Sequence, residues 1–304
     1  MLGRFSGEAA RARARRCCKI LPLLVTTAFG STPEERAIAY LTREVPRWSA
    51  ENHCYSCHNN GDGARALYSA RRQGYAVAAE ALRDTTAWLL RPGDWDSNGG
   101  NPLASDKKLA RIQFAAALAE ADADRDTLIK AADSLLVYQE KDGSWQVDAT
   151  AVAGSPVTYG PVLATYMARR TLARADAARF RDAISRADGW LRNVKPDSVP
   201  DAAALLMAFD KRESFDLIRR AQAADGGWGP RPHTPSEVFD TALVLLALPR
   251  GETAERGRAY LIRSQLPSGG WPETTRPSGG QSYAQHISTT AWATMALLAT
   301  QVEP

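Results

Sequence analysis

Two cysteines and a histidine stand together near the start of the chain, in the stretch ENHCYSCHNN. Cys54 and Cys57 are three positions apart, and His58 follows the second cysteine directly. This spacing lets two sulfur atoms reach the vinyl edge of a porphyrin while the imidazole reaches the iron from one face. The pattern therefore predicts covalently attached haem c, with His58 as an axial iron ligand.

Two other chemistries use the same residues. Cys54 and Cys57 are spaced for a structural or redox-active disulfide, and the three side chains together resemble half of a zinc site. The zinc interpretation lacks a second cysteine pair, because the remaining cysteines, Cys17 and Cys18, lie far upstream. The disulfide interpretation leaves His58 without a role.

Residues 1–30 indicate the compartment. They combine several arginines with the short apolar run KILPLLVTTAFGS, and Ala28-x-Gly30 before Ser31 reads as a cleavage site. We therefore expect a signal peptide at 1–30 and an exported, periplasmic mature protein. The alternative is a disordered basic tail on a cytoplasmic protein. The apolar run is shorter than a membrane-spanning helix requires, so no membrane span is expected.

Charge gives no indication of a nucleic-acid partner. The formal net charge is +4, but residues 1–30 hold six of the 38 Lys and Arg residues and one of the 34 Asp and Glu residues. The rest of the chain has 32 basic against 33 acidic residues, dispersed among one another. A basic binding surface is therefore not predicted.

Internal repeats define the architecture. The segments QEKDGSW, QAADGGW and QLPSGGW share the pattern Q-x-x-x-G-x-W and end at Trp145, Trp228 and Trp271. Trp190, in ADGWLRN, falls midway between the first two and reads as a degenerate copy. Each copy lies between an amphipathic, Arg-rich helix and an apolar one, which predicts outer and buried inner helices.

The same period divides residues 31–304 into six helical hairpins. Later hairpins begin near Asp126, Ala177, Glu213 and Glu252. We predict one all-α domain, an (α/α)6 toroid of six helical hairpins, with the haem-attachment loop at 51–63 in the first hairpin. An open helical solenoid is the alternative architecture.

The repeats resemble the QW motifs of the terpene cyclase and protein prenyltransferase superfamily. ISTTAWATMALLA, near the C-terminus, is similar to the closing repeat of squalene-hopene cyclases. The resemblance covers residues 126–300 well and implies a toroid. It identifies a fold and not a reaction.

The chain departs from those enzymes in its chemistry. It has no D-x-D-D element, with which triterpene cyclases protonate their substrate, and no cysteine remains for a prenyltransferase zinc site. Asp201 and Asp240, near the starts of inner helices, either point into the ring or act as first-turn acids.

The sixth position of a haem iron would be filled by a residue on the same rim. His286 is the first candidate, because a closed ring makes the sixth hairpin a neighbour of the first, and His233 is the second. Met167, Met207 and Met295 read as core residues.

Two functions follow. The first is an exported electron-transfer protein carrying one haem, with an unidentified redox partner. The second is a binder or enzyme whose toroid cavity takes an isoprenoid-like lipophilic molecule. A haemless scaffold is a third possibility.

Overall fold

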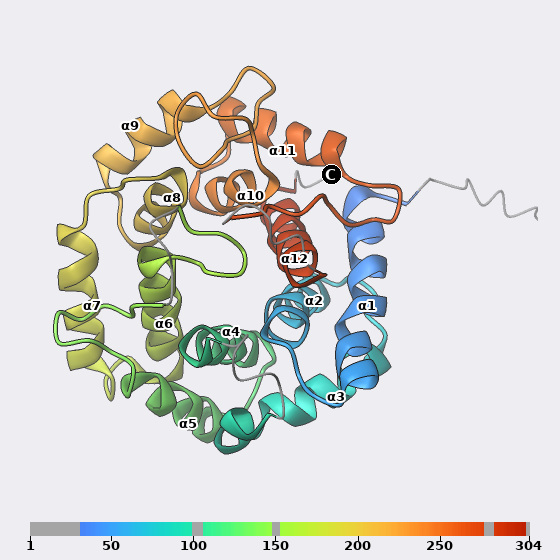
Figure 1. The fold of residues 1–304 in the computed structure, drawn as a ribbon, viewed down its shortest axis with the longest axis vertical. Coiled ribbons are helices and arrows are strands. Elements are labelled where there is room, and N and C mark those ends of the chain that lie inside the picture. Colours follow the sequence, from blue (N-terminus) through green and yellow to red (C-terminus); the bar gives the residue numbers. More distant parts are fainter. Residues whose placement is uncertain (1–30, 99–105, 148–152, 277–282, 302–304) are drawn as a thin grey trace, which may run out of the picture. The chain divides into compact units, whose positions relative to one another are not determined.

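Amphipathic and apolar helices alternate along the chain and form two concentric rings (Figure 1). The computed structural model describes residues 31–98, 106–147, 153–276 and 283–301. The predicted signal peptide at 1–30 lies outside this part and stays a prediction. The outer helices are α1 (Pro33–Asn52), α3 (Ala79–Leu89), α5 (Arg125–Leu136), α7 (Arg181–Asn193), α9 (Arg212–Ala221) and α11 (Glu252–Ser264).

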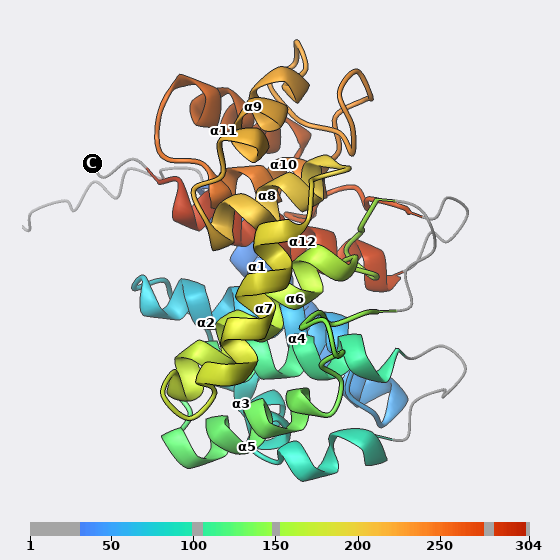
Figure 2. The ribbon, with the colours of Figure 1, turned by 90° about the vertical axis from the view of Figure 1, so that its left-hand side faces the viewer.

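The inner ring consists of α2 (Ala64–Arg72), α4 (Lys107–Glu120), α6 (Pro161–Asp176), α8 (Val199–Ala208), α10 (Val238–Ala247) and α12 (Tyr283–Ala299). Seen from the side in Figure 2, α4, α6 and α12 lie side by side, and all three begin at the same edge of the ring. The described ranges contain no β-strand, only an isolated bridge between Trp228 and Glu237. The all-α toroid predicted from the sequence is confirmed.

The ring is closed by contacts between its first and last hairpins. Helix α12 packs against both α1 and α2. Gln265 Nε2 donates a hydrogen bond to the Pro33 carbonyl over 2.8 Å, and Arg258 of α11 pairs with Glu34. The open solenoid is therefore excluded.

The Q-x-x-x-G-x-W turns connect the outer and inner helices of three hairpins, and their glutamines reach the next hairpin. Trp228 Nε1 donates to the Ile218 carbonyl at 2.8 Å, and its backbone N–H donates to Thr241 Oγ1 at 2.9 Å. Gln222 Nε2 bonds the Thr253 carbonyl of the following outer helix at 2.9 Å. Gly226 has φ +90°, and a Cβ there would lie 2.7 Å from the Arg256 carbonyl oxygen, so this position favours glycine.

Trp190 does not belong to this set. It lies inside α7 rather than in a turn, so its interpretation as a degenerate copy of the repeat is wrong. In the third hairpin the turn between α5 and α6 contains Trp145, whose Nε1 donates to the Leu135 carbonyl at 2.9 Å. Gln139 Nε2 of the same turn donates to the Ala183 carbonyl of α7, in the fourth hairpin, at 2.8 Å.

The first hairpin has a different connection. Residues Cys57–Gly63 form a widened helical turn, η1, that runs directly into α2. The Ala64 N–H donates to the Asn59 carbonyl, five residues back, as in a π-type turn. Such turns are rare and are found mostly at functional sites. This turn packs against α4, α12 and α1.

Candidate active site

Cys54, Cys57 and His58 lie where the sequence placed them, between α1 and α2. Both cysteines are free thiols. Cys54 Sγ accepts a hydrogen bond from Trp48 Nε1 at 3.2 Å, and Cys57 packs against the hydrophobic core. Burial raises the pKa of the Cys57 thiol to about 12, so it is neutral at physiological pH.

Two asparagines attach η1 to the neighbouring helices. Asn59 Nδ2 donates to the Glu44 carbonyl of α1 and to the Tyr283 hydroxyl, both at 2.7 Å. Asn60 Nδ2 donates to Thr85 Oγ1 of α3, also at 2.7 Å. Both asparagines are fully buried, so these bonds fix the position of the turn.

Asp62 lies at the inner end of this turn, between two glycines. A Cβ at Gly61 would lie 3.0 Å from Gln113 Cβ of α4, and a Cβ at Gly63 would lie 3.0 Å from Val45 Cγ2 of α1. The absence of these side chains lets η1 approach its neighbours closely. Asp62 is thereby carried into the interior with no exposed surface.

Three neutral side chains from three inner-ring segments contact the Asp62 carboxyl. Tyr159 donates its hydroxyl hydrogen to Oδ1, and Gln113 Nε2 donates to Oδ2 at 2.8 Å. The Ser288 hydroxyl of α12 also acts on this carboxyl and lowers its pKa. Ser288 Oγ lies 3.0 Å from His58 Nδ1.

Burial controls the charge of this cluster. It raises the pKa of Asp62, against the opposing effects of the Arg65 charge and the three hydrogen bonds, and so favours a protonated carboxyl. It also lowers the pKa of His58 to about 4, so the imidazole is neutral at physiological pH. A neutral carboxylic acid inside an apolar ring can act as a proton donor.

The backbone at Tyr159 is strained. Its φ is +59°, in the left-handed region that bulky residues rarely adopt. Gly154 packs against it, because a Cβ there would lie 2.0 Å from the Tyr159 carbonyl oxygen. Strain of this kind concentrates at functional sites.

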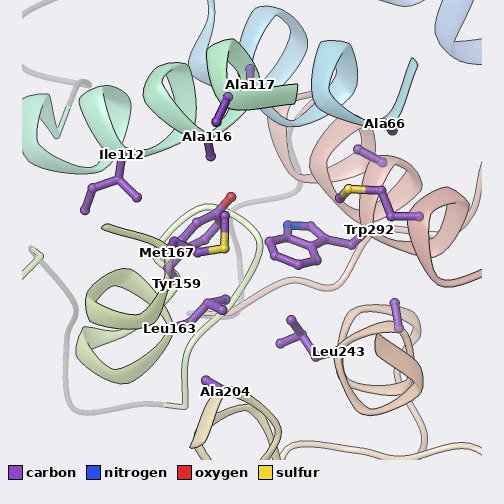
Figure 3. Close-up of a cluster of buried hydrophobic side chains, with 14 of the residues drawn as sticks. Ala66, Ile112, Ala116, Ala117, Tyr159, Leu163, Met167, Ala204, Leu243 and Trp292 are labelled. Carbon is purple, nitrogen blue, oxygen red and sulfur yellow. The ribbon is translucent and has the colours of Figure 1, made fainter. Parts of the chain in front are cut away.

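Tyr159 and Trp292 lie among aliphatic side chains in the interior of the ring (Figure 3). The Tyr159 and Trp292 rings meet edge to face with their centroids 5.6 Å apart, and Phe239 meets Trp292 in the same way at 5.8 Å. The Arg65 guanidinium lies 4.6 Å from the centre of the Trp292 ring. These side chains fill the interior, since Trp292 and Phe239 have no exposed surface and Tyr159 has 1%.

A second buried acid occupies the neighbouring sector. Asp240 of α10 is fully buried and pairs with Arg276 through both oxygens at 2.8 Å. Burial raises the pKa of Asp240 to about 7 although Arg276 favours its charged form. Arg276 also donates to the Gly154 carbonyl at 2.6 Å, so this pair holds the segment that leads to Tyr159. Asp201 is a partly exposed first-turn acid of α8.

The predicted distal ligands lie elsewhere. His286 is two residues from Ser288 on α12, a rotation of about 200° around the helix, so the two side chains face different neighbours. His286 Nδ1 lies 3.4 Å from Glu273 Oε2, and its ring packs against Tyr40. The structure therefore does not bring His286 and His58 together. His233 lies on the surface.

The three methionines behave as core residues. Met167 and Met295 are 1% and 6% exposed, and Met207 packs against the same core. Within the described ranges, no group of three or more His, Cys, Asp or Glu residues is arranged to hold a metal ion. No helix in the described part is both long and apolar enough to cross a membrane.

The closed ring of helical hairpins around a buried acid defines a terpene cyclase-like α/α toroid. Type II terpene cyclase MstE from Scytonema, in complex with geranylgeranyl dihydroxybenzoate, has a TM-score of 0.50 and 15% identity, over 88% of this chain and 98% of that one. A protein from Actinoplanes reaches 0.55 and 16% over the same shares. At these identities the likeness shows the fold alone.

A sequence relative belongs to the same group of enzymes. Drimenyl diphosphate synthase from Streptomyces showdoensis is 28% identical over 181 residues, which are 49% of this chain and 33% of that enzyme. The chain thus matches about a third of the length of that curated relative. No family model matches the sequence.

These findings correct the main functional prediction. The sequence relative is a drimenyl diphosphate synthase and the fold is like that of terpene cyclases, so the interpretation as an electron-transfer haem protein is wrong. In the turn after Cys54, the side chains of Asn59, Asn60 and Asp62 are fully buried and pack inside the ring. Covalent haem attachment at Cys54 and Cys57 is not itself tested by these observations.

Four residues of this cluster were not predicted from the sequence: Asp62, Gln113, Tyr159 and Ser288. The available signal was the tripeptide Gly61-Asp62-Gly63 at the start of an inner helix, where an isolated acid is flanked by residues that permit close packing. The CxxCH motif a few positions upstream drew the interpretation toward the cysteines.

Proposed function

We propose that this protein protonates an isoprenoid-type lipophilic substrate inside the toroid and thereby starts its cyclisation, with Asp62 as the acid. The observation that carries the proposal is the fully buried Asp62 carboxyl, whose pKa is raised by burial and which accepts hydrogen bonds from Tyr159 and Gln113. The likeness to terpene cyclases supports it at the level of the fold. No D-x-D-D element is required, because a single neutral acid suffices to donate a proton.

The aromatic interior suits the same chemistry. Protonation of a carbon–carbon double bond leaves positive charge on carbon, and the electron-rich faces of Trp292 and Phe239 favour a cation within van der Waals reach. These residues exclude water, which would otherwise capture the cation.

Substrate entry requires space that the described conformation does not have. Tyr159 and the segment before it fill the part of the interior next to Asp62. A bound chain must therefore displace Tyr159, whose strained backbone lowers the cost of leaving this position by roughly 1 to 3 kcal/mol.

To test this, the purified protein is incubated in deuterium oxide with linear farnesyl or geranylgeranyl diphosphate, or with the corresponding free alcohol. We expect a cyclic product carrying one deuterium, identified by mass spectrometry. Asp62→Asn should lower the rate by about a hundredfold to ten-thousandfold, the usual contribution of a general acid.

Asp201→Asn is the matched control, because it changes another acid of the inner ring, one whose pKa is also raised by burial but which lies outside the cluster. It should leave the rate unchanged. Retention of full activity by Asp62→Asn, or loss only in Asp201→Asn, would refute the assignment of Asp62.

A further inference from the structure

Asp62 needs a route by which its proton is replaced. In the proposed function the carboxyl gives its proton to the substrate, and the next turnover requires a new one. Asp62, Ser288, Gln113 and Tyr159 are all at most 1% exposed, so solvent does not reach the carboxyl directly.

Of the side chains around the Asp62 carboxyl, Ser288 is the one that connects toward the protein surface. The Ser288 hydroxyl acts on the Asp62 carboxyl, and its Oγ lies 3.0 Å from His58 Nδ1. A serine hydroxyl has one hydrogen and two acceptor positions, so it can accept a proton from one neighbour while donating to the other. His58 is partly exposed, whereas Gln113 and Tyr159 end within the core.

We propose that His58 and Ser288 form a proton relay that connects solvent to the buried Asp62 carboxyl. The relay rests on the proposed function, because only an acid that is consumed in each turnover must be recharged. It also gives a role to the histidine of the CxxCH motif.

The proton balance is simple. The Asp62 carboxylate takes the hydrogen of the Ser288 hydroxyl, Ser288 takes the hydrogen on His58 Nδ1, and His58 Nε2 takes one from solvent. The imidazole thus changes tautomer and no net charge remains on the relay. Return to the starting tautomer requires one further exchange with solvent at the ring nitrogens.

The surrounding charges favour this direction of transfer. Burial lowers the pKa of His58, so the ring passes a proton on rather than retaining it as a cation. Arg65, the charged residue that the carboxyl faces, stabilises the Asp62 anion until it is recharged. The Cys57 thiol beside His58 is neutral and does not compete for the proton.

Infrared spectroscopy tests the relay without a substrate. The protonated carboxyl of Asp62 is identified as the carbonyl band that disappears in Asp62→Asn. Rapid transfer of the protein from water to deuterium oxide shifts this band, and the rate of the shift measures proton exchange at the buried acid.

We expect His58→Ala and Ser288→Ala to slow the shift by about tenfold or more, within the range of single proton-transfer contributions. His286→Ala, on another face of α12, is the matched control and should exchange at the wild-type rate. Added imidazole should restore exchange in His58→Ala, which a merely structural role of His58 would not produce.

Two failures are distinguishable. A carboxyl band that exchanges equally fast in wild type, His58→Ala and Ser288→Ala overturns the relay and leaves Asp62 as the acid. If no protonated carboxyl band depends on Asp62 near neutral pH, the proposed function fails and the relay fails with it. Circular dichroism of each variant confirms that the ring is intact.

Discussion

Replacement of Tyr159 by phenylalanine tests whether Asp62 is neutral. The change keeps the ring that packs against Trp292 and removes only the hydroxyl that donates to Asp62 Oδ1. Loss of a hydrogen bond between neutral groups costs about 1 kcal/mol, whereas loss of one to a buried carboxylate costs about 1.5 to 3 kcal/mol. The free energy of unfolding therefore reports the charge of the partner.

Tyr68→Phe provides the reference value. Tyr68 is also fully buried, and its hydroxyl lies 2.8 Å from Thr86 Oγ1, a neutral partner at every pH. We expect both variants to lose about 1 kcal/mol near pH 5 in urea denaturation. The two variants differ only in whether the group left behind can ionise.

The pH dependence has a defined sign. Because burial raises the folded-state pKa of Asp62, the folded protein binds the extra proton, and its stability falls as pH rises from the unfolded pKa, about 3.9, through the folded one. Tyr159→Phe removes a bond that lowers this pKa, so its loss should grow with pH relative to Tyr68→Phe. An excess loss of more than about 1 kcal/mol already near pH 5 would show a charged carboxylate and refute the reasoning.

Three further changes test the ring itself. Trp228→Ala removes a fully buried indole and its bond to the Ile218 carbonyl, and should cost about 3 to 5 kcal/mol in urea denaturation; a loss under about 1 kcal/mol would contradict the structural role of the repeat. Gly257→Ala places a Cβ 2.5 Å from Trp228 Cζ3 and should lower the melting temperature through overpacking of about 1 to 3 kcal/mol, whereas an unchanged melting temperature would show that α11 and the Trp228 ring move apart easily. Burial raises the pKa of Glu120, but four arginine charges lower it to about 2, so its stabilising effect is present above the unfolded pKa and is lost as pH falls through the folded one. Glu120→Gln should abolish about 3 kcal/mol of this acid-induced loss, measured as the unfolding free energy between about pH 5 and about pH 2, and an unchanged pH slope would assign the effect to other carboxyls.

The architecture was predictable because its signals are local. The amphipathic and apolar periods of neighbouring helices, and the repeated turns ending at Trp145, Trp228 and Trp271, each lie within a few tens of residues. The contacts confirm the reason for the repeat, since each tryptophan bonds the outer helix before it and the inner helix after it.

The candidate site was not predictable in the same way. Asp62 meets Gln113 and Tyr159, which are 51 and 97 residues away along the chain, and no local pattern indicates that these side chains meet. The acidity of Asp62 depends on its burial by these distant partners, which the sequence around it does not encode. CxxCH, by contrast, is a motif recognisable from five consecutive residues, and the function was therefore predicted from it rather than from Asp62.

The closure of the ring by α12 has a consequence for biosynthesis. Ser288 and Trp292 belong to the last inner helix, yet they complete the surroundings of an acid that is translated more than two hundred residues earlier. A nascent chain that lacks α12 leaves Asp62 facing water, where its pKa returns toward that of an ordinary, ionised aspartate. The environment that raises the pKa of Asp62 therefore forms only once the whole ring has assembled, so under the proposed function a partly made chain does not protonate substrate.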